Sequence, residues 1–192
     1  MLRISVAPLC FAALAGCAAT PPGAKAPEKC PTQHVTVSLL ASPRVNPTRD
    51  GEARPVVVRV YQLRSDVRLA NAPFEKVWHD DKATLGDDLV KADERTVYPR
   101  ERADLSFDRV AGVDHVAALA LFQSPQGRSW AASFELPPAP APGACTTACD
   151  EDDDACDARA VAAPHLSFYL DANRIADGAE HLDEYPSAGA LR

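Results

Sequence analysis

The sequence predicts an all-β protein, a two-sheet sandwich with short helical insertions. Short stretches in which apolar and polar residues alternate recur along the chain, as in His34–Leu39 and Trp130–Leu136. This period of two is typical of strands with one buried face. Turn-forming residues separate the stretches, and about seven short strands spaced in this way favour a sandwich.

The expected strands follow one another through most of the chain. They lie at residues 34–40, 56–63, 95–98, 103–107, 113–122, 130–136 and 166–170. The stretch Val113–Phe122 is nearly all apolar, which indicates a central strand. One segment differs, because Phe74, Val77 and Trp78 have the i, i+3, i+4 spacing of a helix. Residues 71–85 are therefore expected to form one or two short helices packed on a sheet.

The N-terminus has the features of a bacterial export signal. A basic residue precedes an apolar run, residues 4–15, which is shorter than the roughly 20 residues that span a bilayer. The run ends in Leu14-Ala15-Gly16-Cys17, which resembles the lipobox of bacterial lipoproteins. The resemblance implies a signal peptide of residues 1–16 and acylation of Cys17. Because Ala18 rather than Asp follows, it also implies the periplasmic face of the outer membrane. The alternative is an ordinary secretory signal with a chance cysteine.

The predicted mature chain has one folded domain. Residues 17–33 are rich in proline and small polar residues and form a tether. Residues 34–176 form the sandwich, with a Cys-rich acidic insertion at 137–163, and residues 177–192 form a polar tail. The formal net charge is −7 and there is no basic stripe, which argues against nucleic acid as a partner.

The mature sequence contains four cysteines that are not lipidation candidates. They are Cys30, Cys145, Cys149 and Cys156. In an oxidising compartment they are disulfide candidates, and four cysteines allow three pairings. Three lie in the insertion, so Cys30 is expected to pair with one of these. Zinc bound by the insertion cysteines and His165 is the alternative, which fits an oxidising compartment less well. The acidic run 150–154 lacks the spacing of a known calcium loop, and no metal or cofactor is predicted.

No catalytic motif is evident. The sequence has no Gly-x-Ser-x-Gly, no His-Glu-x-x-His and no glycine-rich phosphate loop. Asp87 and Asp88 are adjacent, so their side chains point apart and make a poor acid–base pair. The run His79-Asp80-Asp81 fits the exposed face of a helix better than a metal site. No catalytic residues are predicted, and an enzyme built on His79 or His165 is the least favoured alternative.

A long segment, residues 41–55, separates the first two predicted strands. It contains three prolines, an Asp-Gly pair and three arginines. A loop of this length in a compact domain is usually functional or disordered. Its arginines, on an acidic protein, favour an acidic partner surface. Val45-Asn46-Pro47 is expected to form a stiff tip with a low ordering cost. The residues alone leave open whether this is a solvated loop or a binding loop.

Several motifs in order resemble one known family. They are Pro55-Val56-Val57-Val58-Arg59-Val60-Tyr61-Gln62-Leu63, Leu85-Gly86-Asp87-Asp88-Leu89, Tyr98-Pro99, Gly112-Val113 and Trp130. Together with the lipobox, this series is similar to the TssJ family, the outer-membrane lipoproteins of the type VI secretion system. The similarity covers roughly residues 34–136, and the first motif is its most specific part.

The resemblance implies a transthyretin-like β-sandwich that is not an enzyme. Its partner would be the periplasmic C-terminal region of TssM, in a complex that also contains TssL. The family's binding loop joins the first two strands, which gives the candidate contacts Arg44, Val45, Asn46, Pro47, Thr48, Arg49 and Asp50. Two features depart from the family: Gln123 stands where an Arg is expected, and the insertion at 137–163 is unusual. A stand-alone periplasmic module that binds an ion or small ligand is the alternative.

Overall fold

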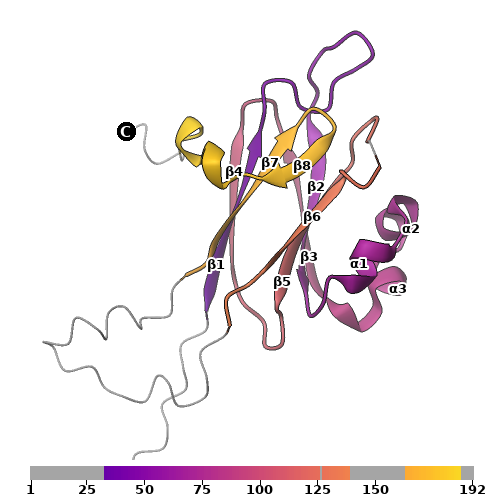
Figure 1. The fold of residues 1–192 in the computed structure, drawn as a ribbon, viewed down its shortest axis with the longest axis vertical. Helices are drawn as coiled ribbons and strands as arrows, with labels where there is room; N and C mark the ends of the chain where they lie inside the picture. The colour runs from indigo at the N-terminus through magenta and orange to yellow at the C-terminus, as the bar shows by residue number, and fades with distance from the viewer. Residues whose placement is uncertain (1–32, 126, 139–162, 187–192) are drawn as a thin grey trace, which may run out of the picture.

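A computed structural model of the chain describes residues 33–125, 127–138 and 163–186 as two four-stranded sheets packed face to face (Figure 1). The strands are β1 (His34–Ala41), β2 (Val56–Leu63), β3 (Leu89–Val97), β4 (Arg102–Asp108), β5 (His115–Ala120), β6 (Ala131–Glu135), β7 (His165–Asp171) and β8 (Arg174–Asp177). One sheet has the order β4-β1-β7-β8 and is called the β1 sheet; the other, β3-β2-β5-β6, is called the β2 sheet. The predicted two-sheet all-β sandwich is confirmed.

The first strand lies inside its sheet. β1 pairs antiparallel with β4, from His34 opposite Asp108 to Leu40 opposite Arg102. On its other side it pairs parallel with β7. The alternation seen in the sequence has its expected cause, because Val35, Val37 and Leu39 are fully buried between the sheets.

The helical segment contains three α-helices where one or two were expected. They are α1 (Val67–Asn71), α2 (Phe74–His79) and α3 (Asp81–Leu85), followed by the 3₁₀ turn η1 (Gly86–Asp88). Pro73 is the N-cap residue of α2, and Asp80 separates α2 from α3. The Asp80 carboxylate accepts a hydrogen bond of 3.0 Å from the Ala83 backbone N–H, so it caps α3 rather than lying on the face of one longer helix.

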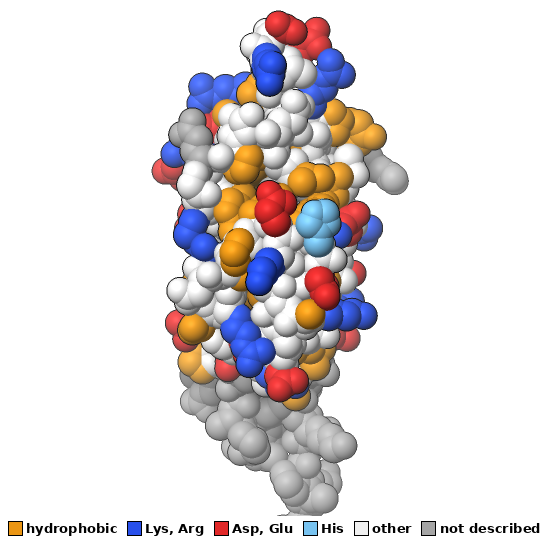
Figure 2. All heavy atoms as spheres, turned by 90° about the vertical axis from the view of Figure 1, so that its right-hand side faces the viewer, with side chains coloured by type: hydrophobic (Ala, Val, Ile, Leu, Met, Phe, Trp, Pro, Cys, Tyr) orange, Lys and Arg blue, Asp and Glu red, His pale blue; other side chains and the backbone are white. Residues whose placement is uncertain are grey.

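These helices cover part of the outer face of the β2 sheet, the side of the molecule that faces the viewer in Figure 2. The Arg59 guanidinium lies 4.1 Å from the Trp78 ring centroid and donates to the Trp78 carbonyl at 2.7 Å. Phe74 packs against Trp78 and Trp130. Because the helices cover this outer face and the other sheet covers the inner face, β5 is apolar on both faces, as predicted for a central strand.

Two elements extend beyond their predicted bounds. β3 begins at Leu89 rather than at residue 95, because its charged residues conceal the strand pattern. Charges on an edge strand such as β3 also hinder pairing with other chains. The segment described from the sequence as a polar tail contains the end of β8 and the 3₁₀ helix η2 (Ala179–Glu184). There the His181 ring stacks on Tyr169, with centroids 3.8 Å apart.

Candidate functional site

The connection between β1 and β2 projects from one end of the sandwich (Figure 1). The turns after β3, β5 and β7 lie at the same end, since all three strands run toward it. Gln33, where the described chain begins, lies at the opposite end, because β1 runs the whole length between them. The loop, residues 42–55, is therefore presented away from the point at which the tether enters the domain.

The lower part of this loop is part of the core. Val45 is fully buried and Asn46 is 5% exposed. The Arg54 backbone N–H donates to the Val45 carbonyl at 3.1 Å, which closes the two legs of the loop above the sandwich. The expectation that Val45-Asn46-Pro47 forms the tip is therefore wrong, because Val45 gains more from burial between the sheets than from exposure in a loop.

Asn46 links its own loop to the β5–β6 connection and to the β7–β8 turn through hydrogen bonds. Its backbone N–H donates to the Ala172 carbonyl in the β7–β8 turn at 2.6 Å. Its side-chain oxygen accepts from the Gln123 N–H at 2.8 Å, and its amide donates to the Pro55 carbonyl at 2.9 Å. Its φ of 49° lies in the left-handed region, which asparagine tolerates better than most residues. These bonds fix the base of the loop to the body.

Arg44 forms a second fastening. Its guanidinium donates to both oxygens of Asp171, at 2.8 and 3.0 Å, in a bidentate pair. The Arg44 side chain is 74% exposed, whereas that of Asp171 is 8% exposed. The hydrogen bonds from Arg44, and then its charge, hold the pKa of the Asp171 carboxyl below its usual value. Arg44 thus has an internal partner for its charge, although most of its side chain is exposed.

The exposed tip is formed by Thr48–Glu52, a tight turn with internal hydrogen bonds. The Thr48 N–H donates to the Glu52 carbonyl at 2.9 Å, and the Gly51 N–H donates to the Thr48 carbonyl at 3.0 Å. The Glu52 N–H also donates to the Thr48 hydroxyl at 3.2 Å. Gly51 has a φ of 83°, which favours glycine at this position. The tip is consequently a preformed turn.

The charge of the loop differs from the expectation of a basic loop. Arg44 is neutralised by Asp171, and Arg54 donates to Glu52 at 2.7 Å. Within the part of the chain that the structure describes, Arg49 makes no ion pair. Figure 2 shows side chains of both signs at this end. The loop therefore offers a mixed polar tip rather than a uniform positive surface.

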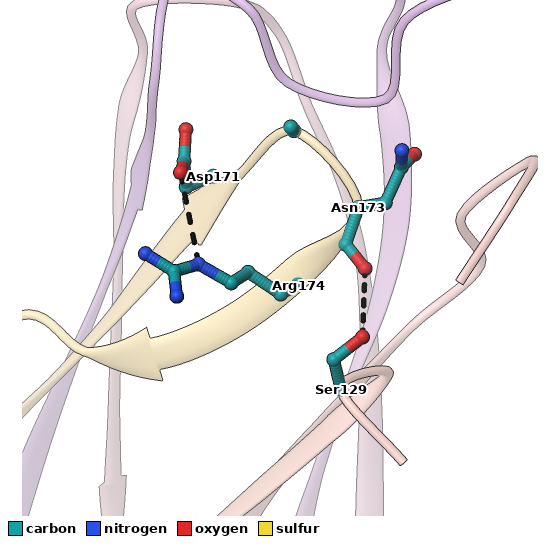
Figure 3. A pocket seen from close by; sticks show the side chains of 5 residues that line it. Ser129, Asp171, Asn173 and Arg174 are labelled. Carbon is teal, nitrogen blue, oxygen red and sulfur yellow. Dashed lines mark hydrogen bonds and ion pairs between the residues drawn. The ribbon is translucent and has the colours of Figure 1, made fainter. Parts of the chain in front are cut away.

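A hollow of about 250 Å³ lies beside the base of the loop, lined by Ser129, Asp171, Ala172, Asn173 and Arg174 (Figure 3). The Ser129 hydroxyl donates to the Asn173 carbonyl at 3.0 Å, and Arg174 lies 3.7 Å from the Asp171 carboxylate. Asp171 is thus flanked by two arginines. Ser129 thus joins the β7–β8 turn to the β5–β6 connection, and Asp171 joins the same turn to the loop through Arg44, so residues that line the hollow support the base of the loop.

The candidate catalytic and metal residues do not converge on a reaction centre. The Ser38 hydroxyl donates to Asp104 at 2.6 Å and lies 2.8 Å from His165 Nε2. In a catalytic triad the carboxylate orients the imidazole, whereas here it accepts from the serine. In the described ranges, no three His, Cys, Asp or Glu residues are grouped to hold a metal ion. The disulfide candidates Cys30, Cys145, Cys149 and Cys156, and the lipidation candidate Cys17, lie outside these ranges.

A family described as "Type VI secretion lipoprotein, VasD, EvfM, TssJ, VC_A0113" matches residues 33–158. The chain belongs to this family. It is therefore a lipoprotein of the type VI secretion system, and the family is a structural component of that system rather than a family of enzymes. A comparison with curated protein sequences finds no match.

Solved structures of type VI secretion proteins share the fold. The lipoprotein TssJ1 of Pseudomonas aeruginosa is 23% identical, with a TM-score of 0.58, covering 76% of this chain and 95% of that chain. Serratia marcescens Lip, a membrane-bound component of the type VI secretion system, is 18% identical, with a TM-score of 0.61, covering 76% and 96%. A third match, 14% identical with a TM-score of 0.53 and covering 76% and 97%, is described as the TssM C-terminal domain (869–1107) from EAEC. In the described part of this chain, no helix is long and apolar enough to cross a membrane.

Sequence reasoning located the loop but missed the residues that fasten it. Asp171 and Ala172 are distant in sequence, and nothing near them marks a loop contact. Gln123, noted only as a departure from the family, binds Asn46 through its backbone N–H, so its side chain has no part in that bond. The signal that was available is Asn46 itself, because asparagine is favoured where the backbone turns left-handed.

Proposed function

We propose that this lipoprotein anchors a type VI secretion membrane complex to the outer membrane. Acyl chains on Cys17 would hold the outer membrane on its periplasmic face, where several chains on one residue give stable attachment. The loop between β1 and β2 would bind the periplasmic C-terminal region of TssM, in a complex that also contains TssL. The observation that carries the proposal is the placement of this loop at the end of the sandwich opposite Gln33.

The fastening of the loop supports a role in binding. A flexible loop of this length loses conformational freedom when a partner binds, and that loss opposes association. Here the base is fixed by Asn46 and by the Arg44–Asp171 pair, and the tip is closed by Thr48. Most of the ordering has taken place before binding, which is the property expected of a recognition loop.

The burial of the loop residues supports a division of roles among the predicted contacts. Val45 and Asn46 are buried, so they would position the loop rather than touch TssM. Thr48, Arg49 and Asp50 belong to the tip and would form the contact surface, with Pro47 at its edge. Arg44 would contribute the open face of its guanidinium while it stays paired with Asp171.

A capture experiment tests the proposal. The mature chain is compared with a variant in which residues 48–52 are replaced by Gly-Asn, which shortens the tip and keeps Val45, Asn46 and Arg54 in place. The bait is the periplasmic C-terminal region of the cognate TssM. A control variant, Val67→Ser, changes a side chain that is 62% exposed on α1, away from the loop.

The expected result is capture by the wild type and the control, with loss of capture for the short-tip variant at unchanged thermal stability. Capture by all three would move the interface away from the loop. No capture by any folded chain would refute TssM as the partner.

The lipid anchor is tested separately. Cys17→Ser is expected to move the protein from the outer-membrane fraction to the soluble periplasm, and retention in the membrane would contradict lipidation at Cys17.

We propose that Cys30, Cys145, Cys149 and Cys156, which lie outside the described residues, form disulfides in the periplasm, with Cys30 bound to one cysteine of the insertion. Peptide mapping of the exported protein without reduction would identify the pairs. Free thiols throughout would contradict this expectation.

A further inference from the structure

We propose that the free edge of β6 is a second docking surface, on which an extended segment of the partner held by the loop pairs as an added strand of the β2 sheet. The identity of that partner rests on the proposed function. The state of the edge itself follows from the fold and can be measured on this chain alone.

The two sheets have four edge strands, and three of them are protected against pairing with other chains. Charged residues and short length are the usual means of protection. The protected edges are β3, with Lys91, Asp93, Glu94 and Arg95, β4, with Arg102, Asp104 and Asp108, and the four-residue β8, with Arg174 and Asp177. In β6 the residues Ala131–Phe134 include no charge and no proline. β6 is therefore the edge best suited to accept a strand.

The backbone groups of β6 point alternately toward β5 and toward the free edge. The Ala120 N–H donates to the Trp130 carbonyl at 2.8 Å, and the Leu136 N–H donates to the Asp114 carbonyl at 2.7 Å. The even-numbered residues of β6 therefore face β5, and in an antiparallel ladder the residues between them turn their N–H and carbonyl groups away. Ser133 lies in the middle of the strand and points both groups to the free edge. Among the described residues, these two groups have no hydrogen-bond partner.

The side chain of Ser133 borders a hollow of about 260 Å³ between α1 and β6. Leu69 and Ala70 line its helix side, and Ala131 and Ser133 line its strand side. The Ser133 hydroxyl oxygen is buried and has no hydrogen-bond partner within the part of the chain that the structure describes. In an added strand, the residue opposite Ser133 lies on the same face, with a Cβ distance of about 5 Å. A threonine or serine at that position would give the hydroxyl its missing partner and place a small side chain beside the hollow.

Apolar surface also remains uncovered along this edge. Ala131, Ala132 and Phe134 pack against the core but are only partly buried. The Phe134 ring lies 4.8 Å from the Phe168 ring, between the centroids, and still keeps part of its surface exposed. In the neighbouring strand β5, residues 116–120 are all buried. A strand added to β6 would cover this apolar surface in addition to forming backbone hydrogen bonds, which is the mode of recognition that sheet edges offer to extended peptides.

The position of β6 favours the partner that the loop binds. The strand begins at the loop end of the sandwich (Figure 1), two residues after Ser129, which lines the hollow beside the base of the loop. The Ile175 N–H donates to the Ser129 carbonyl at 2.8 Å, so the free edge of β6 begins directly below the β7–β8 turn that supports the loop. A partner that contacts the tip is therefore well placed to extend a segment along β6 toward the tether end.

A second copy of this chain fits the edge less well than a different partner does. Two β6 edges related by a two-fold axis would pair antiparallel. The loop ends of the two copies would then point in opposite directions, so only one loop would face away from a membrane that holds both tethers. An extended segment of another chain is free of this constraint.

Hydrogen exchange of the full mature chain, with and without the periplasmic C-terminal region of TssM, tests the proposal at single amides. In the free chain the Ser133 and Glu135 amides are expected to exchange rapidly, because their N–H groups point to the free edge. The Ala132 and Phe134 amides, which face β5, are expected to exchange slowly in both states. In the complex, exchange at Ser133 and Glu135 is expected to slow by at least about tenfold, together with that of tip residues 48–52.

The pattern of protection separates this proposal from the proposed function. Protection of the tip without protection of Ser133 and Glu135 would overturn the proposal and leave the loop contact in place. Slow exchange of these two amides already in the free chain would also overturn it, because the chain itself or a second copy would then cover the edge. No protection at either place would refute the binding of TssM, and this proposal with it.

A proline substitution tests the edge by affinity. Ser133→Pro removes the N–H that an added strand needs and keeps the ladder with β5, because that N–H faces away from β5. The matched control is Ala92→Pro in β3, the other edge strand of the same sheet. Ala92 lies opposite Tyr61, whose backbone groups face β5, so the Ala92 N–H likewise points away from its neighbour.

Ser133→Pro is expected to raise the Kd for TssM by about tenfold, through the lost hydrogen bond and the bulk of the proline ring, and the control is expected to leave the Kd unchanged. If Ser133→Pro does not fold, Glu135→Pro removes the next N–H on the same edge and is expected to act in the same direction. An unchanged Kd in a folded variant at either position would overturn the proposal.

Discussion

Asn46 is the residue whose replacement tests the architecture of the loop most sharply. Its side chain makes two hydrogen bonds, to the Gln123 N–H and the Pro55 carbonyl, and its backbone has a φ of 49°. We consider Asn46→Ala and Asn46→Gly. Both variants lose the two bonds, but only glycine keeps easy access to the left-handed conformation.

The expected loss in the free energy of unfolding is the sum of these contributions. Each lost hydrogen bond costs about 1 kcal/mol of the free energy of unfolding, and alanine, which lacks the local hydrogen bonding that lets asparagine tolerate the left-handed backbone, pays about 1–2 kcal/mol more. Asn46→Ala is therefore expected to lower the free energy of unfolding by about 3–4 kcal/mol, and Asn46→Gly by about 2–3 kcal/mol. Val45 is buried directly before this position, so the loss is expected to reach the core and not only the tip.

Urea denaturation followed by tryptophan fluorescence measures both values, with Asn46→Asp as a third variant. The aspartate keeps the acceptor for the Gln123 N–H but places a buried carboxylate oxygen against the Pro55 carbonyl, so it is expected to cost at least as much as Asn46→Ala. A loss below about 1 kcal/mol for Asn46→Ala would refute the view that this residue fastens the loop. Equal losses for alanine and glycine would show that the left-handed backbone contributes nothing.

Three further predictions concern stability. The pKa of Asp171 is lowered by its hydrogen bonds with Arg44, so this pair stabilises the fold above the carboxyl's unfolded pKa of about 3.9 and ceases to do so as the pH falls through the lowered value. Acid unfolding followed by circular dichroism should therefore depend less steeply on pH in Asp171→Asn, and an unchanged slope would contradict the pairing. Val45→Ala should cost about 2 kcal/mol in urea denaturation, and a neutral result would place Val45 outside the core. Gly178→Ala should cost about 1–3 kcal/mol, since a Cβ there would lie 3.0 Å from the Tyr169 backbone nitrogen; an unchanged melting temperature would contradict that close approach.

Local patterns were sufficient for the elements that have a simple periodicity. β1 alternates because one of its faces packs on the opposite sheet, and β5 is apolar throughout because helices cover its second face. β3 escaped detection over its first six residues, because an edge strand carries charged residues that hinder pairing with other chains. η2 also escaped detection, because its sequence is mostly polar and it packs on the sheet through the stacking of the His181 ring on Tyr169.

The loop shows where sequence reasoning reaches its limit. Its length, position and family resemblance identified the segment correctly as the connection between the first two strands. Which residues face outward depended on contacts with Ala172 and Gln123, which the chain brings to Asn46 from two other connections. The charge of Arg44 is likewise compensated by Asp171, a partner distant in sequence. Such long-range partners are set by topology and not by local pattern.

Site-specific photocrosslinking in cells tests the central claim most directly. A photoreactive amino acid is placed at Asp50 in the tip or at Val110, which is 41% exposed in the β4–β5 connection at the opposite end of the sandwich. We predict a crosslink to TssM from position 50 and none from position 110. A crosslink from position 110 alone, or from neither position in a cell with an assembled secretion system, would contradict the account.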